Sequence, residues 1–178
     1  MELGEKTVKK NYVFKGKIIN VRCDDAVLPN GKPCTREVVE HSGGASVLAV
    51  DKDDNCYLVK QFRYPYKEEL LEIPAGKLNF GENPYVAALR ELKEETGLIA
   101  KKLELLTTLY PSPGYTNEII YIYLATDFAQ DEVCFDEDEF LLTVKMPFKE
   151  AVEKIYTGEI KDAKTIAALL MRDKKQTF

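Results

Sequence analysis

The sequence predicts an α+β domain with a mixed central sheet and an N-terminal β arm. Runs of β-branched and aromatic residues typical of strands dominate the centre of the chain. One well-capped helical segment interrupts these runs and helical patterns close the chain, so the regular alternation of a parallel βαβ fold is missing. The 178 residues, 45% of them hydrophobic, are enough for one domain with a buried core.

The arm is expected to cover residues 1–42, and the main domain residues 43–178. Residues 12–23 predict a strand, Asn30-Gly31 marks a hairpin-type turn, and residues 36–41 provide the returning strand. A two-stranded arm is marginal in water unless its apolar residues pack against something else. We therefore expect the arm to pack on its own domain or on a second copy of the chain.

The main domain begins with a predicted hairpin around the Asp-rich turn 51–55, formed by residues 45–50 and 56–62. Residues 68–74 are too short to assign from their pattern. The remaining expected elements are strands near 103–109, 118–126 and 140–146, and helices near 148–157 and 162–171 on either side of Gly158.

The helix between these strands is predicted over residues 84–96. Asn83 is a favourable N-cap, Pro84 suits the first helical position, and Gly97 suits the position just past the helix end. The apolar residues expected to pack this helix on the sheet are Val86, Ala88, Leu89 and Leu92.

Composition excludes several classes of function. The net charge of −5 argues against non-specific binding to nucleic acid or to an anionic membrane, which needs a basic surface. No run is apolar and long enough for a membrane span. The four cysteines form no C-x-x-C pair and the chain has one histidine, so a thiolate zinc site is not expected. We expect free thiols and a cytoplasmic protein.

Three glutamates occupy neighbouring positions on the predicted helix. Glu91 lies three residues before Glu94 and four before Glu95, which places their carboxylates on one face. Like charges at this spacing repel, but they become favourable around a hard cation such as Mg²⁺, which binds oxygen ligands. The acidic spacing alone is more commonly a solvated helix face, with nearby basic residues as counter-charges.

The residues around these glutamates favour the metal. The segment from Gly76 to Leu98 resembles the Nudix box, G-x5-E-x7-R-E-U-x-E-E-x-G-U with U aliphatic, at every fixed position. Such a match arises by chance on the order of once per billion windows. The resemblance implies a Nudix-type α/β/α sandwich that hydrolyses a pyrophosphate linked to another moiety. It also implies a divalent cofactor, Mg²⁺ or alternatively Mn²⁺, with two or three ions per site.

The resemblance also assigns roles position by position. It implies metal ligation by Glu91, Glu95 and the backbone carbonyl of Ala75, with Glu94 as a further ligand or close support. Arg90 would orient the glutamates through charge-assisted hydrogen bonds. Glu82 would fix the loop, and Gly76, a candidate substrate contact, would lie where a side chain would clash.

Features outside the box resemble the ADP-ribose pyrophosphatases. Ser112-Pro113-Gly114 with Glu118 matches their S-P-G-x-x-x-E loop, 15 residues past Leu98. The substrate-binding residues implied by this resemblance are Arg36, Arg63, Glu72, Gly114 and Glu118. In the subfamily a glutamate-rich loop also closes over the substrate. Glu137 would then be the general base and Glu139 a metal ligand, although the D-E-D-E repeat leaves the register open by a residue or two.

The resemblance favours a homodimer with exchanged arms, and ADP-ribose as substrate, giving AMP and ribose 5-phosphate. Two alternatives stay open: hydrolysis of another nucleoside diphosphate sugar or an oxidised nucleotide, and a non-catalytic ADP-ribose sensor. The intact glutamates favour an enzyme over a sensor. The residue that would stack on adenine is not assigned, because the arm offers several apolar and aromatic candidates: Tyr12, Phe14, Ile18 and Ile19.

Overall fold

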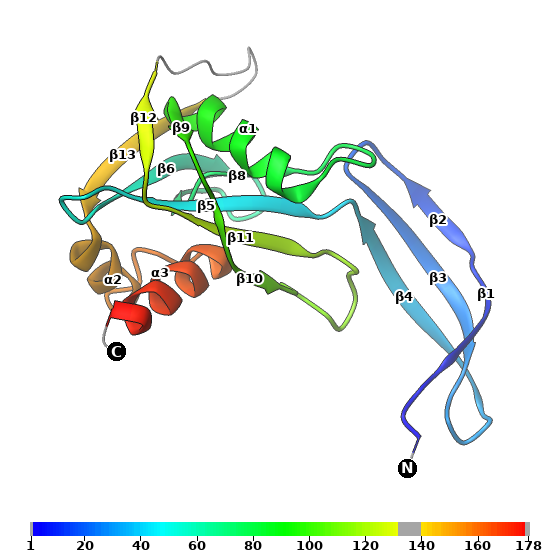
Figure 1. Ribbon diagram of the computed structural model, residues 1–178. Helices are drawn as coiled ribbons and strands as arrows, with labels where there is room; N and C mark the ends of the chain where they lie inside the picture. The colour runs from blue at the N-terminus through cyan, green and yellow to red at the C-terminus, as the bar shows by residue number, and fades with distance from the viewer. Residues whose placement is uncertain (1, 132–139, 177–178) are drawn as a thin grey trace. The chain divides into compact units, whose positions relative to one another are not determined.

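The computed structural model describes residues 2–131 and 140–176. The chain divides into two compact units (Figure 1). The first joins Met1–Gly43 with Tyr110–Ile119, and the second joins Gly44–Leu109 with Ile120–Phe178. Each unit has its own sheet.

The first unit is an antiparallel sheet centred on β3. Both β1 and β2 pair with β3, and β4 pairs with it over its full length. The turn between β3 and β4 has Gly31 in the left-handed region at φ 82°, as the Asn-Gly pair predicts. The strands of this unit are β1 (Lys6–Lys9), β2 (Tyr12–Lys15), β3 (Ile19–Val27) and β4 (Pro33–His41).

The single strand predicted over residues 12–23 is wrong, because the chain reverses within it. The Gly16 N–H donates to the Ile19 carbonyl at 2.9 Å, closing a tight turn between β2 and β3. A Cβ at Gly16 would lie 2.6 Å from Phe14 Cε1, so a side chain at this position would force the turn to shift. β-Branched composition predicted extended backbone here but gave no sign of where the chain reverses.

The second unit is built around a mixed sheet in the order β10-β11-β5-β6-β13. β5 runs parallel to β11 and antiparallel to β6. β5 and β6 pair only near their shared hairpin, and β8 then pairs with β5 while β7 pairs with β6. The strands are β5 (Gly44–Val50), β6 (Asn55–Arg63), β7 (Glu68–Glu72), β8 (Ala75–Lys77), β9 (Leu98–Ala100), β10 (Glu104–Leu109), β11 (Ile120–Ala125), β12 (Phe128–Gln130) and β13 (Leu141–Pro147).

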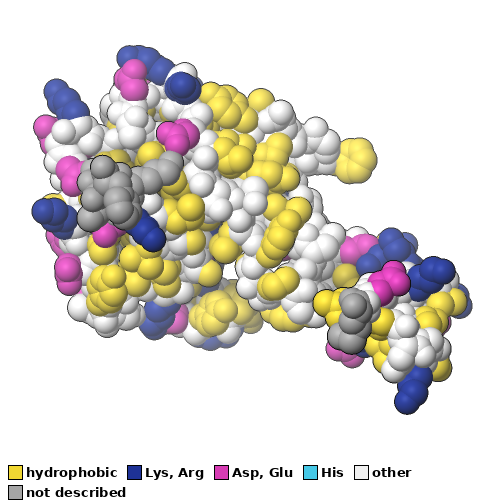
Figure 2. Space-filling view, turned by 60° about the horizontal axis from the view of Figure 1, so that its bottom comes forward, with side chains coloured by type: hydrophobic (Ala, Val, Ile, Leu, Met, Phe, Trp, Pro, Cys, Tyr) yellow, Lys and Arg dark blue, Asp and Glu magenta, His cyan; other side chains and the backbone are white. Residues whose placement is uncertain are grey.

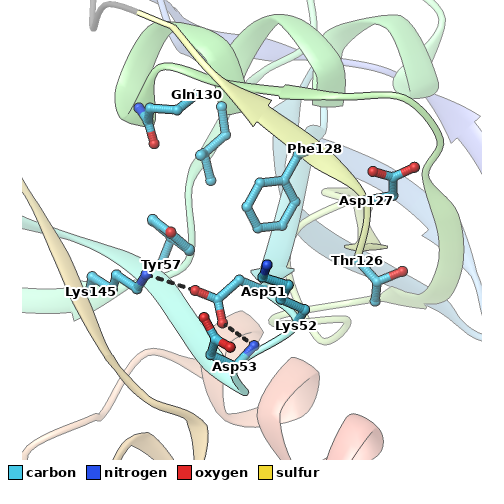
Figure 3. Close-up of a pocket in the computed structure, with 10 residues that line it drawn as sticks. Asp51, Lys52, Asp53, Tyr57, Thr126, Asp127, Phe128, Gln130 and Lys145 are labelled. Atoms are coloured by element: carbon cyan, nitrogen blue, oxygen red, sulfur yellow. Dashed lines mark hydrogen bonds and ion pairs between the residues drawn. The ribbon is translucent and has the colours of Figure 1, made fainter.

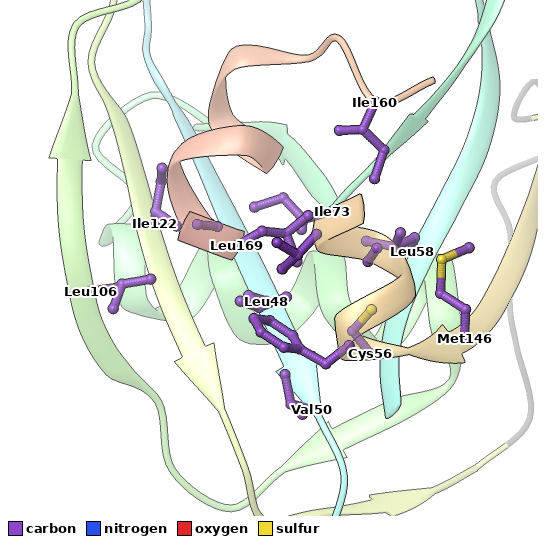
Figure 4. Packing of buried hydrophobic residues seen from close by; sticks show 14 residues of the cluster. Leu48, Val50, Cys56, Leu58, Ile73, Leu106, Ile122, Met146, Ile160 and Leu169 are labelled. Atoms are coloured by element: carbon purple, nitrogen blue, oxygen red, sulfur yellow. The ribbon is translucent and has the colours of Figure 1, made fainter. Parts of the chain in front are cut away.

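Helices cover both faces of this sheet, which gives an α/β/α sandwich. Alternate residues of β5 point to opposite faces: Val47 packs in the cluster with α1, and Leu48 in the cluster with α2 and α3. Figure 4 shows the second cluster, where Leu169 lies near Ile73 and Leu48. The helices are α1 (Pro84–Thr96), α2 (Phe148–Tyr156) and α3 (Ala163–Gln176).

The predicted α+β class and the sandwich are confirmed. The hairpin around residues 51–55 forms as expected. Four short strands were not predicted: β1, β8, β9 and β12 have three or four residues each, too few to show a period of two. No helix in residues 2–131 or 140–176 is long and apolar enough to cross a membrane.

Candidate active site

The helix α1 begins and ends where its caps predict. The Asn83 side chain accepts a hydrogen bond from the Tyr85 N–H at 2.8 Å, Pro84 follows, and Gly97 adopts φ 69°. These caps fix the residues at which the helix begins and ends, and the helical period places the three glutamates at neighbouring positions within these bounds. Glu91 and Glu95 are 7% and 3% exposed, so both carboxylates point inward.

The apolar stripe predicted on α1 is partly wrong. Val86 is 55% exposed, while Ala87 and Ala88 are fully buried with Leu92. The helix is therefore rotated so that two alanines approach the sheet closely. Glu91 and Glu95 are buried on this helix together with the two alanines.

Arg90 connects the glutamates of the box. Its Nη1 donates to Glu91 Oε1 at 2.6 Å and to Glu94 Oε2 at 3.0 Å, while Nε and Nη2 bind the two oxygens of Glu82, each at 3.1 Å. The hydrogen bonds with Glu82 are the main reason that the pKa of Arg90 rises and that of Glu82 falls. Glu82 also accepts from the Asn79 N–H at 2.8 Å, which ties the loop to the helix. This geometry supports the orienting role expected for Arg90.

Gly76 lies directly against the Glu91 carboxylate. A Cβ built at this position would fall 1.9 Å from Glu91 Oε1 and 2.0 Å from its Cδ. The neighbouring Ala75 N–H donates to Glu95 Oε2 at 2.9 Å. The strand β8 and the helix α1 therefore meet at two carboxylates and the backbone of residues 75–76.

The donors gathered at this point suit a hard divalent cation. Two buried carboxylates and a nearby backbone carbonyl match the one or two carboxylates that Mg²⁺ usually takes from a protein, with water and phosphate oxygens completing its shell. In residues 2–131 and 140–176, no group of three or more acidic, histidine or cysteine side chains is arranged to hold a metal ion. A metal bound by the two buried carboxylates would therefore need water and substrate oxygens to complete its shell.

Arg63 and Glu72 form a second group in the same unit. Arg63 Nε and Nη2 donate to the two Glu72 oxygens at 2.6 and 2.7 Å, a bidentate pair. Lys164 on α3 also binds Glu72. Burial would raise the pKa of Glu72, but these two cations outweigh it and lower the pKa. The hydrogen bond with Glu72 is the main reason that the pKa of Arg63 rises.

The other predicted substrate residues belong to the first unit. Arg36 on β4 binds Glu5 with two hydrogen bonds of 2.8 and 2.6 Å, and its side chain is 46% exposed. Glu118 lies 3.4 Å from His41 Nδ1. Gly114 lies in a loop that the Val39 backbone holds through hydrogen bonds to residues 115 and 117, and a Cβ on Gly114 would meet nothing within 4 Å.

The predicted general base and fourth metal ligand, Glu137 and Glu139, lie outside the described residues. Their roles stay predictions.

An open cavity of about 370 Å³ has neither Glu91 nor Glu95 in its lining (Figure 3). Two of its charged side chains form an ion pair: Asp51 contacts Lys145 at 2.7 Å, and Asp51 also accepts from the Asp53 backbone N–H at 3.0 Å. Burial opposes ionisation of Asp51, but hydrogen bonds from Lys145 and Asn55 lower its pKa to about 2. Two aromatic rings, Tyr57 and Phe128, pack edge to face with centroids 5.5 Å apart. We assign this cavity a structural role.

Three residues that sequence reasoning missed support the group around Glu72. They are Asp162, Lys164 and Thr165, at the start of α3. The Asp162–Thr165 spacing is a recognisable capping signal, because the Thr165 N–H donates to Asp162. No sequence signal connects Lys164 with Glu72, which lies far away along the chain.

Comparisons with known proteins agree with this geometry. Residues 40–169 match the NUDIX domain, and residues 5–39 match the nucleoside diphosphate sugar hydrolase N-terminal domain. The chain is 44% identical to an ADP-ribose pyrophosphatase of Bacillus subtilis (strain 168), covering 94% of this chain and 91% of the relative. It is 40% identical to a methanol dehydrogenase activator of Bacillus methanolicus, covering 93% and 90%.

A more distant relative is a GDP-mannose pyrophosphatase of Yersinia enterocolitica serotype O:8 / biotype 1B, at 37% identity over 75% of each chain. A crystal structure of an ADP compounds hydrolase superposes with a TM-score of 0.85, covering 99% of this chain and 97% of that one at 24% identity. That likeness supports the fold. Because the NUDIX match spans most of the chain and relatives align over nearly its full length, the chain belongs to the Nudix family of hydrolases.

Proposed function

We propose that this enzyme hydrolyses the pyrophosphate bond of ADP-ribose, giving AMP and ribose 5-phosphate, with Mg²⁺ as cofactor. The observation that carries the proposal is the contact between the Glu91 carboxylate and Gly76. It places a buried carboxylate against bare backbone, next to Glu95 and Ala75. The 44% identical relative named as an ADP-ribose pyrophosphatase supports the choice of substrate.

In this proposal Glu91, Glu95 and the Ala75 carbonyl would hold the metal. Bound Mg²⁺ would neutralise diphosphate charge and make water a better nucleophile at neutral pH. Arg90 keeps Glu91 and Glu94 in fixed directions through the hydrogen bonds described above. A preset ligand geometry reduces the reorganisation needed when substrate binds.

The remaining proposed roles concern the proton and the phosphates. Glu137 would accept the proton of the attacking water, and a phosphorus–oxygen bond of the diphosphate would break. Arg63 and Arg36 would bind phosphate or nucleotide oxygens by charge-assisted hydrogen bonds. These local cations explain how a chain with a net charge of −5 would bind an anion.

Turnover of a panel of compounds tests the proposal. ADP-ribose, GDP-mannose, other nucleoside diphosphate sugars and an oxidised nucleotide are each incubated with Mg²⁺, Mn²⁺ or EDTA, and the products are quantified by chromatography. We expect the highest kcat/KM for ADP-ribose and no turnover with EDTA. Faster hydrolysis of GDP-mannose would favour the alternative that the Yersinia relative suggests. Binding of ADP-ribose without any turnover would identify a sensor.

We further propose that the enzyme is a cytosolic homodimer in which the arm of one copy serves the site of the other. Val13, Phe14 and Ile18 are 66%, 55% and 66% exposed, and Figure 2 shows hydrophobic side chains at the surface among charged ones. Burial of such residues between two copies is favourable, and two-fold symmetry is the commonest arrangement. The free thiols of Cys23, Cys34 and Cys56 support a reducing compartment.

Charge substitutions on the arm test the dimer. We expect Val13→Glu and Ile18→Glu to shift sedimentation from dimer to monomer and to lower turnover at the same concentration. The matched control is Val8→Glu, because Val8 on β1 is also exposed, at 67%, but lies on a different strand. A truncated chain that lacks residues 1–41 and stays a fully active monomer would exclude the arm from the site.

A further inference from the structure

A network of four charged residues connects α3 with the strand that leads to the active site, and two of the four, Glu72 and Lys164, are buried. Glu72, at the end of β7, is 1% exposed. Such a carboxylate is costly to bury unless cations pair with it. It has two: Arg63 from β6 and Lys164 from α3. Lys164, itself 7% exposed, also contacts Asp162 at 3.0 Å, so the four formal charges cancel.

The start of α3 also holds the backbone next to Glu72. The Ile73 N–H donates to Thr165 Oγ1 at 2.8 Å, and Thr165 donates its hydroxyl to Asp162 at 2.6 Å. Two residues further along, the Ala75 N–H binds Glu95 at 2.9 Å. A short extended segment is thus fixed by α3 at one end and by α1 at the other.

The two cations differ in what they can reach. The Lys164 side chain is 8% exposed, whereas that of Arg63 is 39% exposed. Glu72 uses the Nε and one Nη2 donor of Arg63, and a guanidinium has five N–H donors in a rigid plane. The rest of this plane faces away from Glu72, so the orientation of Glu72 decides where Arg63 presents its remaining donors.

We propose that Lys164 is a positioning residue for Arg63: its buried ammonium fixes the Glu72 carboxylate, which in turn aims the guanidinium at an anionic substrate. This inference rests on the proposed function, because an anionic diphosphate substrate is what Arg63 would bind. It adds a residue of the C-terminal helix to the site. Without Lys164, Glu72 would be free to turn with Arg63, and the guanidinium would lose its fixed direction.

Kinetics of Lys164→Met test the proposal. Arg63 would contact the substrate both before and during the reaction, so losing its position raises KM while kcat changes little. We expect KM for the best substrate of the panel to rise tenfold or more, with kcat within threefold of wild type. The matched control is Lys161→Met, because Lys161 binds Glu68 of β7 at 2.9 Å in an exposed pair; its KM should not change.

A double-mutant cycle separates positioning from general stability. In the Arg63→Ala background, Lys164→Met should raise KM by less than twofold further, because Lys164 acts through Arg63. Multiplicative effects of the two substitutions would overturn the proposal, as would an unchanged KM in folded Lys164→Met. If Lys164→Met does not fold, Lys164→Arg replaces it in the test. This variant keeps the positive charge but changes the position of the charged group, so its KM should still rise. A wild-type KM for Lys164→Arg would overturn the proposal.

Failure of the proposed function looks different. Preference for a compound other than ADP-ribose leaves the kinetic test in place, whereas complete failure of hydrolysis means that the wild-type chain turns over no compound of the panel. The network is then tested by equilibrium binding of ADP-ribose to the wild type, Lys164→Met and Lys161→Met. Weaker binding confined to Lys164→Met supports positioning of Arg63, and equal binding by all three overturns it.

Discussion

Substitution of Gly76 by alanine tests the geometry on which the proposed function depends. The added Cβ would lie 1.9 Å from Glu91 Oε1, whereas ordinary contacts begin near 3.4 Å. The carboxylate must therefore retreat by about 1.5 Å, which also breaks its 2.6 Å hydrogen bond with Arg90. Displacement of about 1 Å at a reacting centre can cost roughly a hundredfold in rate.

The fold should survive this substitution. The clashing atoms belong to the far end of a flexible side chain, and Gly76 does not occupy the left-handed region. Overpacking of this kind costs about 1–3 kcal/mol, so the melting temperature should fall by roughly 2–12 °C for a domain of this size. Activity should suffer more: we expect kcat to fall by about a hundredfold, close to 2.7 kcal/mol in the barrier.

Thermal unfolding and steady-state turnover across a range of Mg²⁺ concentrations measure the two effects separately. Gly4→Ala is the matched control, because a Cβ on Gly4 meets nothing within 4 Å, and it should leave both quantities unchanged. A folded Gly76→Ala enzyme with kcat within threefold of wild type would refute the reasoning. It would show that the position of the Glu91 carboxylate does not limit catalysis.

Three further predictions concern single carboxylates. Glu95→Gln should leave the enzyme folded and lower kcat by a hundredfold or more, a loss of about 3 kcal/mol of transition-state stabilisation. The control, Glu153→Gln at an exposed position, should have no effect. Near-wild-type turnover of Glu95→Gln would remove Glu95 from the ligand set. Glu137→Gln should reduce kcat and leave the affinity for Mg²⁺ unchanged, whereas Glu139→Gln should shift the Mg²⁺ concentration that the enzyme needs. Negligible effects of both substitutions would show that residues 136–140 take no part in catalysis. The pKa of Asp51 in the folded protein is lowered from 3.8 to about 2. The ionised Asp51 carboxylate therefore stabilises the fold fully above pH 4, and this stabilisation is lost as the pH falls towards 2. Asp51→Asn should therefore remove roughly 1–2 kcal/mol of the stability that the wild type loses in that window. Denaturant unfolding at pH 5 and pH 2 measures this loss for each protein. An equal loss of unfolding free energy in wild type and Asp51→Asn would contradict the prediction.

The sequence by itself determined the features that are encoded within a few neighbouring residues. The caps Asn83 and Gly97 set the helix ends, and the four-residue spacing of Glu91 and Glu95 places them on one face. The hairpin around residues 51–55 likewise formed as its turn residues predict. In each case the deciding hydrogen bonds join residues close together in the chain, so their spacing is visible without any knowledge of the fold.

Only the tertiary structure decided which faces are buried and which distant residues meet. The helical period placed Val86 on the packing face, but in the structure Val86 is 55% exposed and Ala87 is buried beside the predicted Ala88. The pairing of Lys164 with Glu72 joins residues 92 positions apart, so no short sequence spacing connects them. A contact between distant elements depends on how the sheet and helices pack, and no local preference specifies that packing.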